Sequence, residues 1–123
     1  MGFSPSRTSV DDERLYVFRL LGTGAADVTI ELGPSGATVT RQGVGVHRIT
    51  MPAGSGTFVG VRGYMFGAAT PGDVKGQTVT RDTYTAPTAT ARGFLDIAIW
   101  SSTFAADELQ ATEYLDITLA FSE

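Results

Sequence analysis

The chain has 123 residues, long enough for one domain that buries about two-thirds of the surface exposed by its unfolded chain. It has no Cys and a single His, His47, which excludes a disulfide framework, a thiolate metal site and the zinc and iron sites built from several histidines. The formal net charge of -4 comes from 9 basic and 13 acidic residues, and the basic residues are scattered singly, which argues against nucleic acid as a partner.

The first residues, Met1 to Glu13, are polar and contain Ser and Pro, which predicts an extended arm in front of the domain. This segment lacks the apolar stretch of a secretory signal. No apolar run in the chain approaches the roughly 20 residues that cross a bilayer, so we expect no membrane partner.

Alternation of apolar and polar residues predicts four strands in the first half of the remaining chain. In the second of them Val28, Ile30 and Leu32 are expected to point inward. A tight hairpin or bulge is expected at Gly43, between the third and fourth strands. The four strands are predicted at Leu15 to Leu21, Asp27 to Gly33, Ala37 to Gln42 and Val44 to Met51.

The next predicted strand, Thr57 to Phe66, is apolar at both its even and its odd positions. Such a strand is expected to be covered on both faces or to lie at an interface. The Thr-rich segment Gln77 to Tyr84 is polar on both faces, which is typical of an edge strand.

Two similar segments close the chain, Phe94-Leu-Asp-Ile-Ala-Ile-Trp100 and Tyr114-Leu-Asp-Ile-Thr-Leu119. Each places Leu and Ile on alternate positions, which gives one apolar face to a strand. We interpret them as two neighbouring strands of one antiparallel sheet. Eight short strands separated by turns predict an all-β protein, a single-domain antiparallel β-sandwich or jelly roll over residues 14–123 behind an arm of residues 1–13.

Few residues point to chemistry. Asp96 and Asp116 occupy equivalent places in the closing strands and, side by side, would form a carboxylate pair of the kind used in acid and base catalysis. A charge that keeps an outward face wet is the ordinary alternative. Asp107 and Glu108 add oxygens for a calcium site, but the D-x-D-x-D-G spacing is absent. We therefore expect neither catalytic residues nor a metal or other cofactor.

Several segments resemble small structural proteins of tailed phages. They are Phe18-Arg-Leu-Leu-Gly-Thr-Gly24, Leu32-Gly-Pro-Ser-Gly36, Thr40-Arg-Gln-Gly-Val-Gly-Val-His-Arg-Ile-Thr-Met-Pro52, and the closing part from Ser102 to Leu119. His47 departs from that pattern, in which an aromatic residue is more usual.

The resemblance implies a virion component of the head decoration, or cement, type. Such a protein is β-rich, oligomeric and without enzymatic activity; it is made in the host cytoplasm and binds the major capsid protein on the capsid surface. For this role the candidate partner contacts are Phe3 and Arg7 in the arm, and Phe58, Tyr64 and Phe66 in the apolar strand.

Two alternatives stay open. One is another virion part, such as a tail, neck or fibre head protein. The other is a carbohydrate-binding β-sandwich module, which would display exposed aromatic rings around Trp100, Tyr84 or Tyr114.

Overall fold

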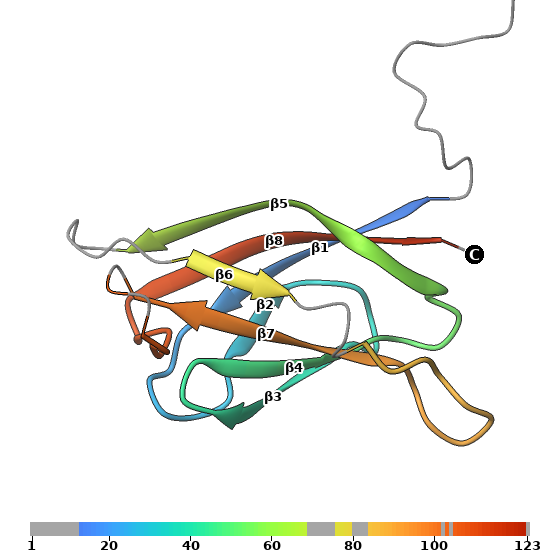
Figure 1. The fold of residues 1–123 in the computed structure, drawn as a ribbon, viewed down its shortest axis with the longest axis horizontal. Coiled ribbons are helices and arrows are strands. Elements are labelled where there is room, and N and C mark those ends of the chain that lie inside the picture. The colour runs from blue at the N-terminus through green and yellow to red at the C-terminus, as the bar shows by residue number, and fades with distance from the viewer. Residues whose placement is uncertain (1–12, 69–75, 80–83, 102, 104, 123) are drawn as a thin grey trace, which may run out of the picture.

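The computed structural model describes residues 13–68, 76–79, 84–101, 103 and 105–122. These residues form eight β-strands in two layers (Figure 1). The strands are β1 (Arg14–Leu21), β2 (Thr29–Leu32), β3 (Thr38–Gly43), β4 (Val46–Thr50), β5 (Thr57–Ala68), β6 (Gly76–Val79), β7 (Phe94–Trp100) and β8 (Glu113–Ser122).

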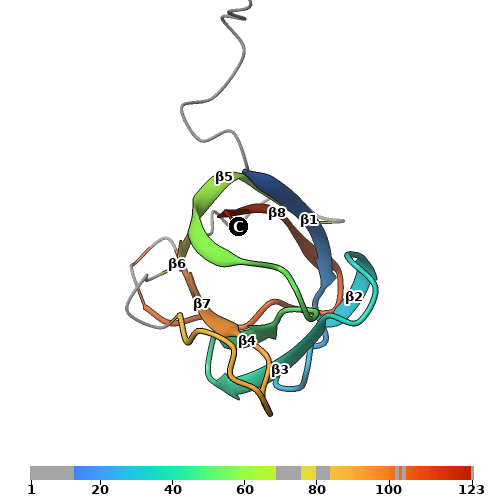
Figure 2. The ribbon, with the colours of Figure 1, turned by 90° about the vertical axis from the view of Figure 1, so that its right-hand side faces the viewer.

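Each layer is a four-stranded sheet, the first in the order β2-β1-β8-β5 and the second in the order β3-β4-β7-β6. All ladders are antiparallel. Viewed along the strands, the two sheets face each other around a common interior (Figure 2). Within the described part of the chain no hydrogen-bonded ladder joins the two sheets. The predicted all-β sandwich is confirmed.

The core consists of the alternate, inward-facing residues of both sheets. In β7 and β8 every second side chain is buried, as the period-2 pattern predicted. These two strands form the centre of the core, because their inward Leu and Ile side chains are almost completely buried: Leu95, Ile97, Leu115, Ile117 and Leu119.

The interpretation of β7 and β8 as neighbours is wrong. β8 lies between β1 and β5, whereas β7 lies between β4 and β6 in the opposite sheet. The similar sequences arise because each is a central strand, buried on one face by the other sheet and solvated on its outer face. The alternation specifies that environment and says nothing about which strand is the partner.

The partners of these two strands correspond as well. Across β1 and β8, Arg19 lies opposite Asp116; across β4 and β7, Arg48 lies opposite Asp96. In the same registers Phe18 of β1 takes the place that His47 takes in β4. The correspondence is one of register and not of a duplicated segment, because β2 follows β1 whereas β3 precedes β4.

Strand β2 shows one departure from the predicted inward face. Val28 is buried and Ile30 packs against the core, but Leu32 is 56% exposed. The register shifts between Arg19 and Leu20, so Leu32 lies opposite the outward-facing Arg19. The bulge therefore turns this side chain to the solvent.

The two ends of the sandwich are closed differently. At one end four aromatic rings pack edge to face or tilted between the sheets, with centroids 5.5 to 6.1 Å apart. They belong to Tyr16, Phe58, Tyr84 and Phe121. At the other end residues 105–112 cross the opening, and Leu109 is completely buried there.

Gly45, in the turn between β3 and β4, allows that crossing segment to approach. Its φ is 67°, and an added Cβ would lie 2.5 Å from the carbonyl oxygen of Asp107. Gly54 has a similar φ of 79°, but no atom lies within 4 Å of its added Cβ. The two glycines therefore have almost the same backbone conformation, but only Gly54 has room for an added Cβ.

We expect Gly45→Ala to lower the free energy of unfolding by clearly more than Gly54→Ala. Each substitution carries the left-handed penalty of about 1–2 kcal/mol, and only the first also forces apart two packed backbones. Urea denaturation of both variants measures the difference, and equal losses would show that residues 105–112 do not pack tightly on this turn.

Candidate interaction surface

The predicted partner contacts fall into different environments. Phe3 and Arg7 lie outside the described residues. Phe58 is 4% exposed and packs against Tyr84 and Phe121 in the core, so its side chain is not available to a partner. This part of the predicted contact set is corrected.

Two bulges in β5 explain why the strand looked apolar on both faces. The register shifts between Phe58 and Gly60 and again between Val61 and Gly63, so each shift adds one residue to β5 relative to β8. After the first bulge the odd-numbered Val61 faces inward; after the second, Tyr64 and the positions that follow recover the original parity. Because of the two bulges, both even-numbered and odd-numbered apolar residues of β5, such as Phe58 and Val61, point to the same inner face.

Tyr64 and Phe66 remain candidate partner contacts, and Tyr64 is the more exposed of the two. Phe66 is partly buried against the core, and its ring meets that of Tyr64 edge to face at 5.9 Å. Tyr64 is 52% exposed. The next residue, Met65, is on the opposite face and is also 52% exposed. The second half of β5 therefore presents large apolar side chains on both faces.

Met65 extends an apolar area on the outer face of the first sheet. Leu15 and Val17 of β1 are 57% and 47% exposed on the same face. Val17 lies across Thr118 of β8 from Gly63, whereas Met65 lies across Asp116 of β8 from Arg19, so Met65 is a diagonal neighbour of Val17 beside the Arg19 and Asp116 pair. We call Leu15, Val17 and Met65 the outer-face patch.

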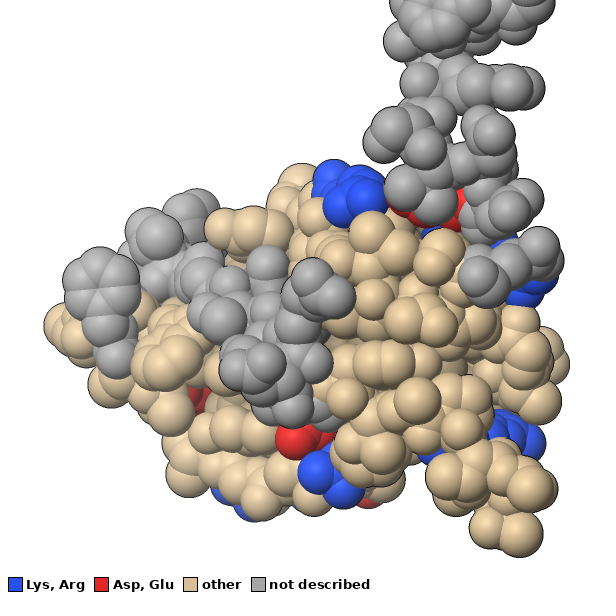
Figure 3. Space-filling model, turned by 45° about the vertical axis from the view of Figure 1, so that its right-hand side comes forward, with Lys and Arg blue, Asp and Glu red and all other residues tan. Residues whose placement is uncertain are grey.

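On the outer face of the second sheet the exposed β3 positions are Thr38, Thr40 and Gln42, whereas the outward apolar residues of β4 and β7 are partly buried. Figure 3 shows one side of the molecule, on which uncharged residues cover a broad continuous area and charged side chains lie mainly near its margins. Exposed large apolar side chains that share one outer face are typical of a surface that another molecule covers.

Ion pairs lie at both ends of the outer-face patch. At one end Arg62, in a bulge of β5, donates from Nε and a terminal nitrogen to the two carboxylate oxygens of Glu13, at 2.9 and 3.0 Å. This bond lowers the pKa of Glu13. Glu13, grouped with the arm from the sequence, is thus held on the folded sheet.

At the other end Arg19 donates to both oxygens of Asp116, at 2.7 and 2.9 Å, and lies 3.6 Å from Glu31. The guanidinium also lies over the ring of Tyr114, 4.9 Å from its centroid. Hydrogen bonding to Arg19 lowers the pKa of Asp116, so this carboxylate stays ionised.

The predicted pair of Asp96 and Asp116 does not form, because the two residues lie in opposite sheets. Asp96 instead accepts hydrogen bonds from Arg48 at 2.9 and 3.3 Å, and that guanidinium lies 4.1 Å from the centroid of the Phe94 ring. The repeated aromatic-Leu-Asp-Ile motif therefore builds the same outer cluster on each sheet, an Arg from the neighbouring strand that is stacked on the aromatic ring and paired with the Asp.

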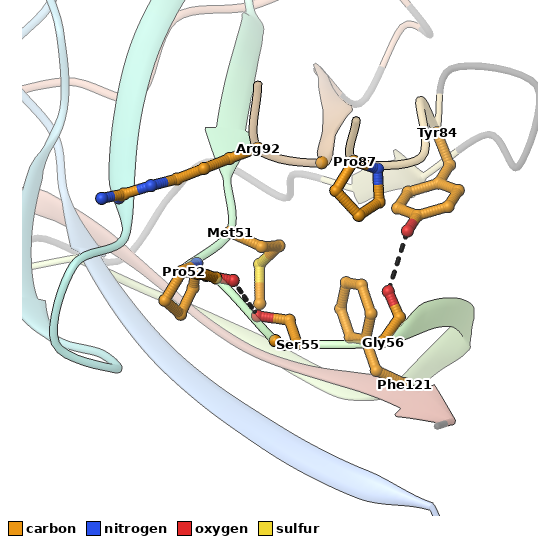
Figure 4. A pocket seen from close by; sticks show the side chains of 11 residues that line it. Met51, Pro52, Ser55, Gly56, Tyr84, Pro87, Arg92 and Phe121 are labelled. Atoms are coloured by element: carbon orange, nitrogen blue, oxygen red, sulfur yellow. Dashed lines mark hydrogen bonds between the residues drawn. The ribbon is translucent and has the colours of Figure 1, made fainter. Parts of the chain in front are cut away.

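A small hollow lies at the aromatic end of the sandwich (Figure 4). The hydroxyl of Tyr84 donates to the carbonyl of Gly56 at 2.9 Å, and that of Ser55 donates to the carbonyl of Pro52 at 2.6 Å. Its volume is about 20 Å³, which is too small for an organic ligand. Beside it lies an open groove of about 330 Å³, lined by Ala53, Gly54 and residues 87–92. Ligand sites of this size normally enclose the ligand, and this groove does not.

Asp107 and Glu108, considered for a calcium site, lie in the segment 105–112 at the end of the sandwich opposite this hollow. Glu108 accepts hydrogen bonds from the Arg41 side chain. Among the described residues no three His, Asp or Glu side chains gather into a group that could hold a metal ion.

The aromatic residues named for a carbohydrate site do not form one patch. Tyr84 packs between the sheets, Tyr114 lies against Arg19 of the first sheet, and Trp100 ends β7 in the second sheet.

Comparison of the chain with protein-family models, with curated proteins and with solved structures finds no match. In the described residues no helix is long and apolar enough to cross a membrane.

Truncation of Phe58 and of Tyr64 should separate the core of β5 from its exposed part. We expect Phe58→Ala to lower the free energy of unfolding by about 3–5 kcal/mol, as for a buried Phe, and Tyr64→Ala by less than about 1 kcal/mol. Chemical denaturation measures both. A loss at Tyr64 as large as that at Phe58 would place Tyr64 in the core and remove it from the contact surface.

Proposed function

We propose that this chain is a non-enzymatic structural protein of a phage virion, a decoration protein that binds the major capsid protein on the outer surface of the head. The observation that carries the proposal is the outer-face patch, an apolar area on one outer face of a sandwich whose core is already complete. The resemblance of its segments to small tailed-phage structural proteins supports this class of function over others.

The geometry suits attachment to a repeated surface. A decoration protein meets many identical sites, so a rigid scaffold that orders few side chains on binding loses little conformational entropy there. Leu15 and Val17 are on β1, which is paired along its whole length with β8. Because these side chains and Met65 are already about half buried, covering them against a partner would contribute roughly 1 kcal/mol each.

Two ion pairs lie beside the residues of the outer-face patch. The pairs of Glu13 with Arg62 and of Arg19 with Asp116 offer polar groups of both signs at the margins of the apolar patch. This arrangement of an apolar centre with a polar rim is common in protein interfaces. Exposed Tyr64 lies on the other face of β5, where it is suited to contact between neighbouring copies of the chain on the shell.

The direct test is co-sedimentation with shells assembled from the major capsid protein encoded in the same genome, followed by negative-stain imaging of the particles. Regular surface density on the shells would support the proposal. Binding to purified tails but not to shells would favour another virion part, and binding to neither would contradict a structural role on the virion surface.

The double variant Leu15→Gln, Met65→Gln should reduce occupancy on shells at least tenfold. Both side chains are half exposed, so the melting temperature should stay within a few degrees of the unmodified protein, while about 2 kcal/mol of binding would be lost if both are covered.

The matched control is Thr38→Gln, Thr40→Gln on the outer face of the second sheet, which should keep full occupancy. If the control variant lost binding and the patch variant did not, the shell would contact the second sheet.

Deletion of residues 1–12 should test the arm while leaving Glu13 to pair with Arg62. We expect little change in the melting temperature, because the deleted residues precede the folded strands. Occupancy on shells should fall if Phe3 and Arg7 contribute contacts. Equal occupancy with and without the arm would leave the folded domain as the attachment surface.

A further inference from the structure

His47 is a buried polar side chain that the proposed interaction surface does not use. It is 1% exposed and faces the core from β4, opposite Arg41 of β3 and Ile97 of β7. Neither of its ring nitrogens has a hydrogen-bond partner among the residues that the structure describes. Such a group is rare in folded proteins, because each unsatisfied buried polar atom costs free energy.

The register explains how the fold accommodates this ring. In the first sheet the equivalent position is Phe18, which is fully buried. A neutral imidazole can take the place of such an aromatic ring as a compact planar side chain. An imidazolium cannot do so without an anion beside it, because a buried charge needs a partner.

The charged groups that act on His47 come from three elements. Glu108 lies in the segment 105–112, Arg41 in β3, and Asp27 just before β2; the neighbour from β7 is the apolar Ile97. Glu108 attracts a positive charge on the ring and Arg41 repels it.

The same groups hold the segment 105–112 in place. Arg41 donates from Nε and from a terminal nitrogen to one carboxylate oxygen of Glu108, at 3.0 and 2.5 Å. Its backbone N–H donates to Asp27 at 2.7 Å. Beside Glu108, Leu109 fills the end of the core, and its carbonyl accepts a hydrogen bond from the N–H of Gly24 at 3.0 Å.

We propose that His47, Arg41 and Glu108 form an acid-sensitive latch, in which a protonated His47 competes with Arg41 for the Glu108 carboxylate and loosens residues 105–112 from β3. Opening the latch uncovers Leu109 and exposes the adjacent end of the core. The neutral ring keeps the latch closed, because Arg41 is then the cation that faces Glu108.

The directions of the pKa shifts agree with this order of events. Burial lowers the pKa of His47 below its ordinary value, so the unfolded chain binds this proton more readily than the folded one. The stability linked to His47 is therefore complete above about pH 6.5 and is lost as the pH falls from there towards the folded pKa. The bond from Arg41 lowers the pKa of Glu108, so its carboxylate is still ionised in that window.

The test compares the full chain with His47→Phe by hydrogen exchange at pH 7.5 and 5.5, after correction for the intrinsic exchange rates. In the unmodified protein, peptides covering 105–112 should lose protection on acidification, with an opening constant that rises by up to about tenfold per pH unit below 6.5. His47→Phe should keep the same protection at both pH values, because it has no proton to bind.

Two further variants, His47→Gln and Glu108→Gln, test the roles of His47 and of Glu108 separately. His47→Gln, which is also neutral at both pH values, should behave like His47→Phe and replaces it if Phe proves too large for the site. Glu108→Gln should loosen the segment already at pH 7.5, because the pair with Arg41 is weakened. An equal acid effect in the unmodified protein and in the His47 variants, or an NMR titration of His47 at or above 6.5, would overturn the proposal.

Discussion

The packing of the central strands of the two sheets against each other is the constraint on which the rest of this structure depends. Leu115 and Ile117 of β8 and Leu95 and Ile97 of β7 contribute their inward side chains to one buried layer. Burial of this layer is the dominant favourable term in folding, since each fully buried side chain of this size contributes about 1.5–3 kcal/mol. Because both strands must present alternate apolar residues to that layer, their outer positions are left for polar and aromatic side chains.

The outer faces of the two central strands carry the same arrangement of charged and aromatic side chains. In each sheet an Asp of the central strand and an Arg of its neighbour pair across the ladder, and the Arg stacks on an aromatic ring two residues before the Asp. Such cross-strand pairs contribute modestly to stability and help to select the register. The outer faces then diverge in exposure: Leu15, Val17 and Met65 of the first sheet are about half exposed, whereas the outward apolar residues of β4 and β7 are partly buried, and the exposed residues are the basis of the proposed attachment to a phage head.

The two ends of the sandwich also have separate roles. The aromatic end is closed by Phe and Tyr rings that pack edge to face or tilted, with no His or carboxylate among them. The opposite end combines a buried His47 with the Arg41 and Glu108 pair. The acid sensitivity of the proposed latch thus belongs to this end, where the segment 105–112 contacts both the β3–β4 turn and the residues that follow β1.

The sequence by itself determined the all-β class, the approximate positions of most strands and the inward faces of β7 and β8, because period-2 alternation is a local property of each strand. It also placed Asp96 and Asp116 in equivalent surroundings. Only the tertiary structure decided that those strands lie in opposite sheets, since a central strand looks the same whichever strand is beside it.

The candidate contact surface was predictable only in part for the same kind of reason. Tyr64 and Phe66 were named from the apolar content of β5, but two bulges, which no residue type announces reliably, decided that Phe58 is core and that Met65 is outward. The outer-face patch joins residues of β1 and β5 across β8, and that proximity arises from strand pairing over long sequence separations. Local patterns fix which side chains share a face within one strand, whereas a surface made by several strands exists only once the sheet has formed.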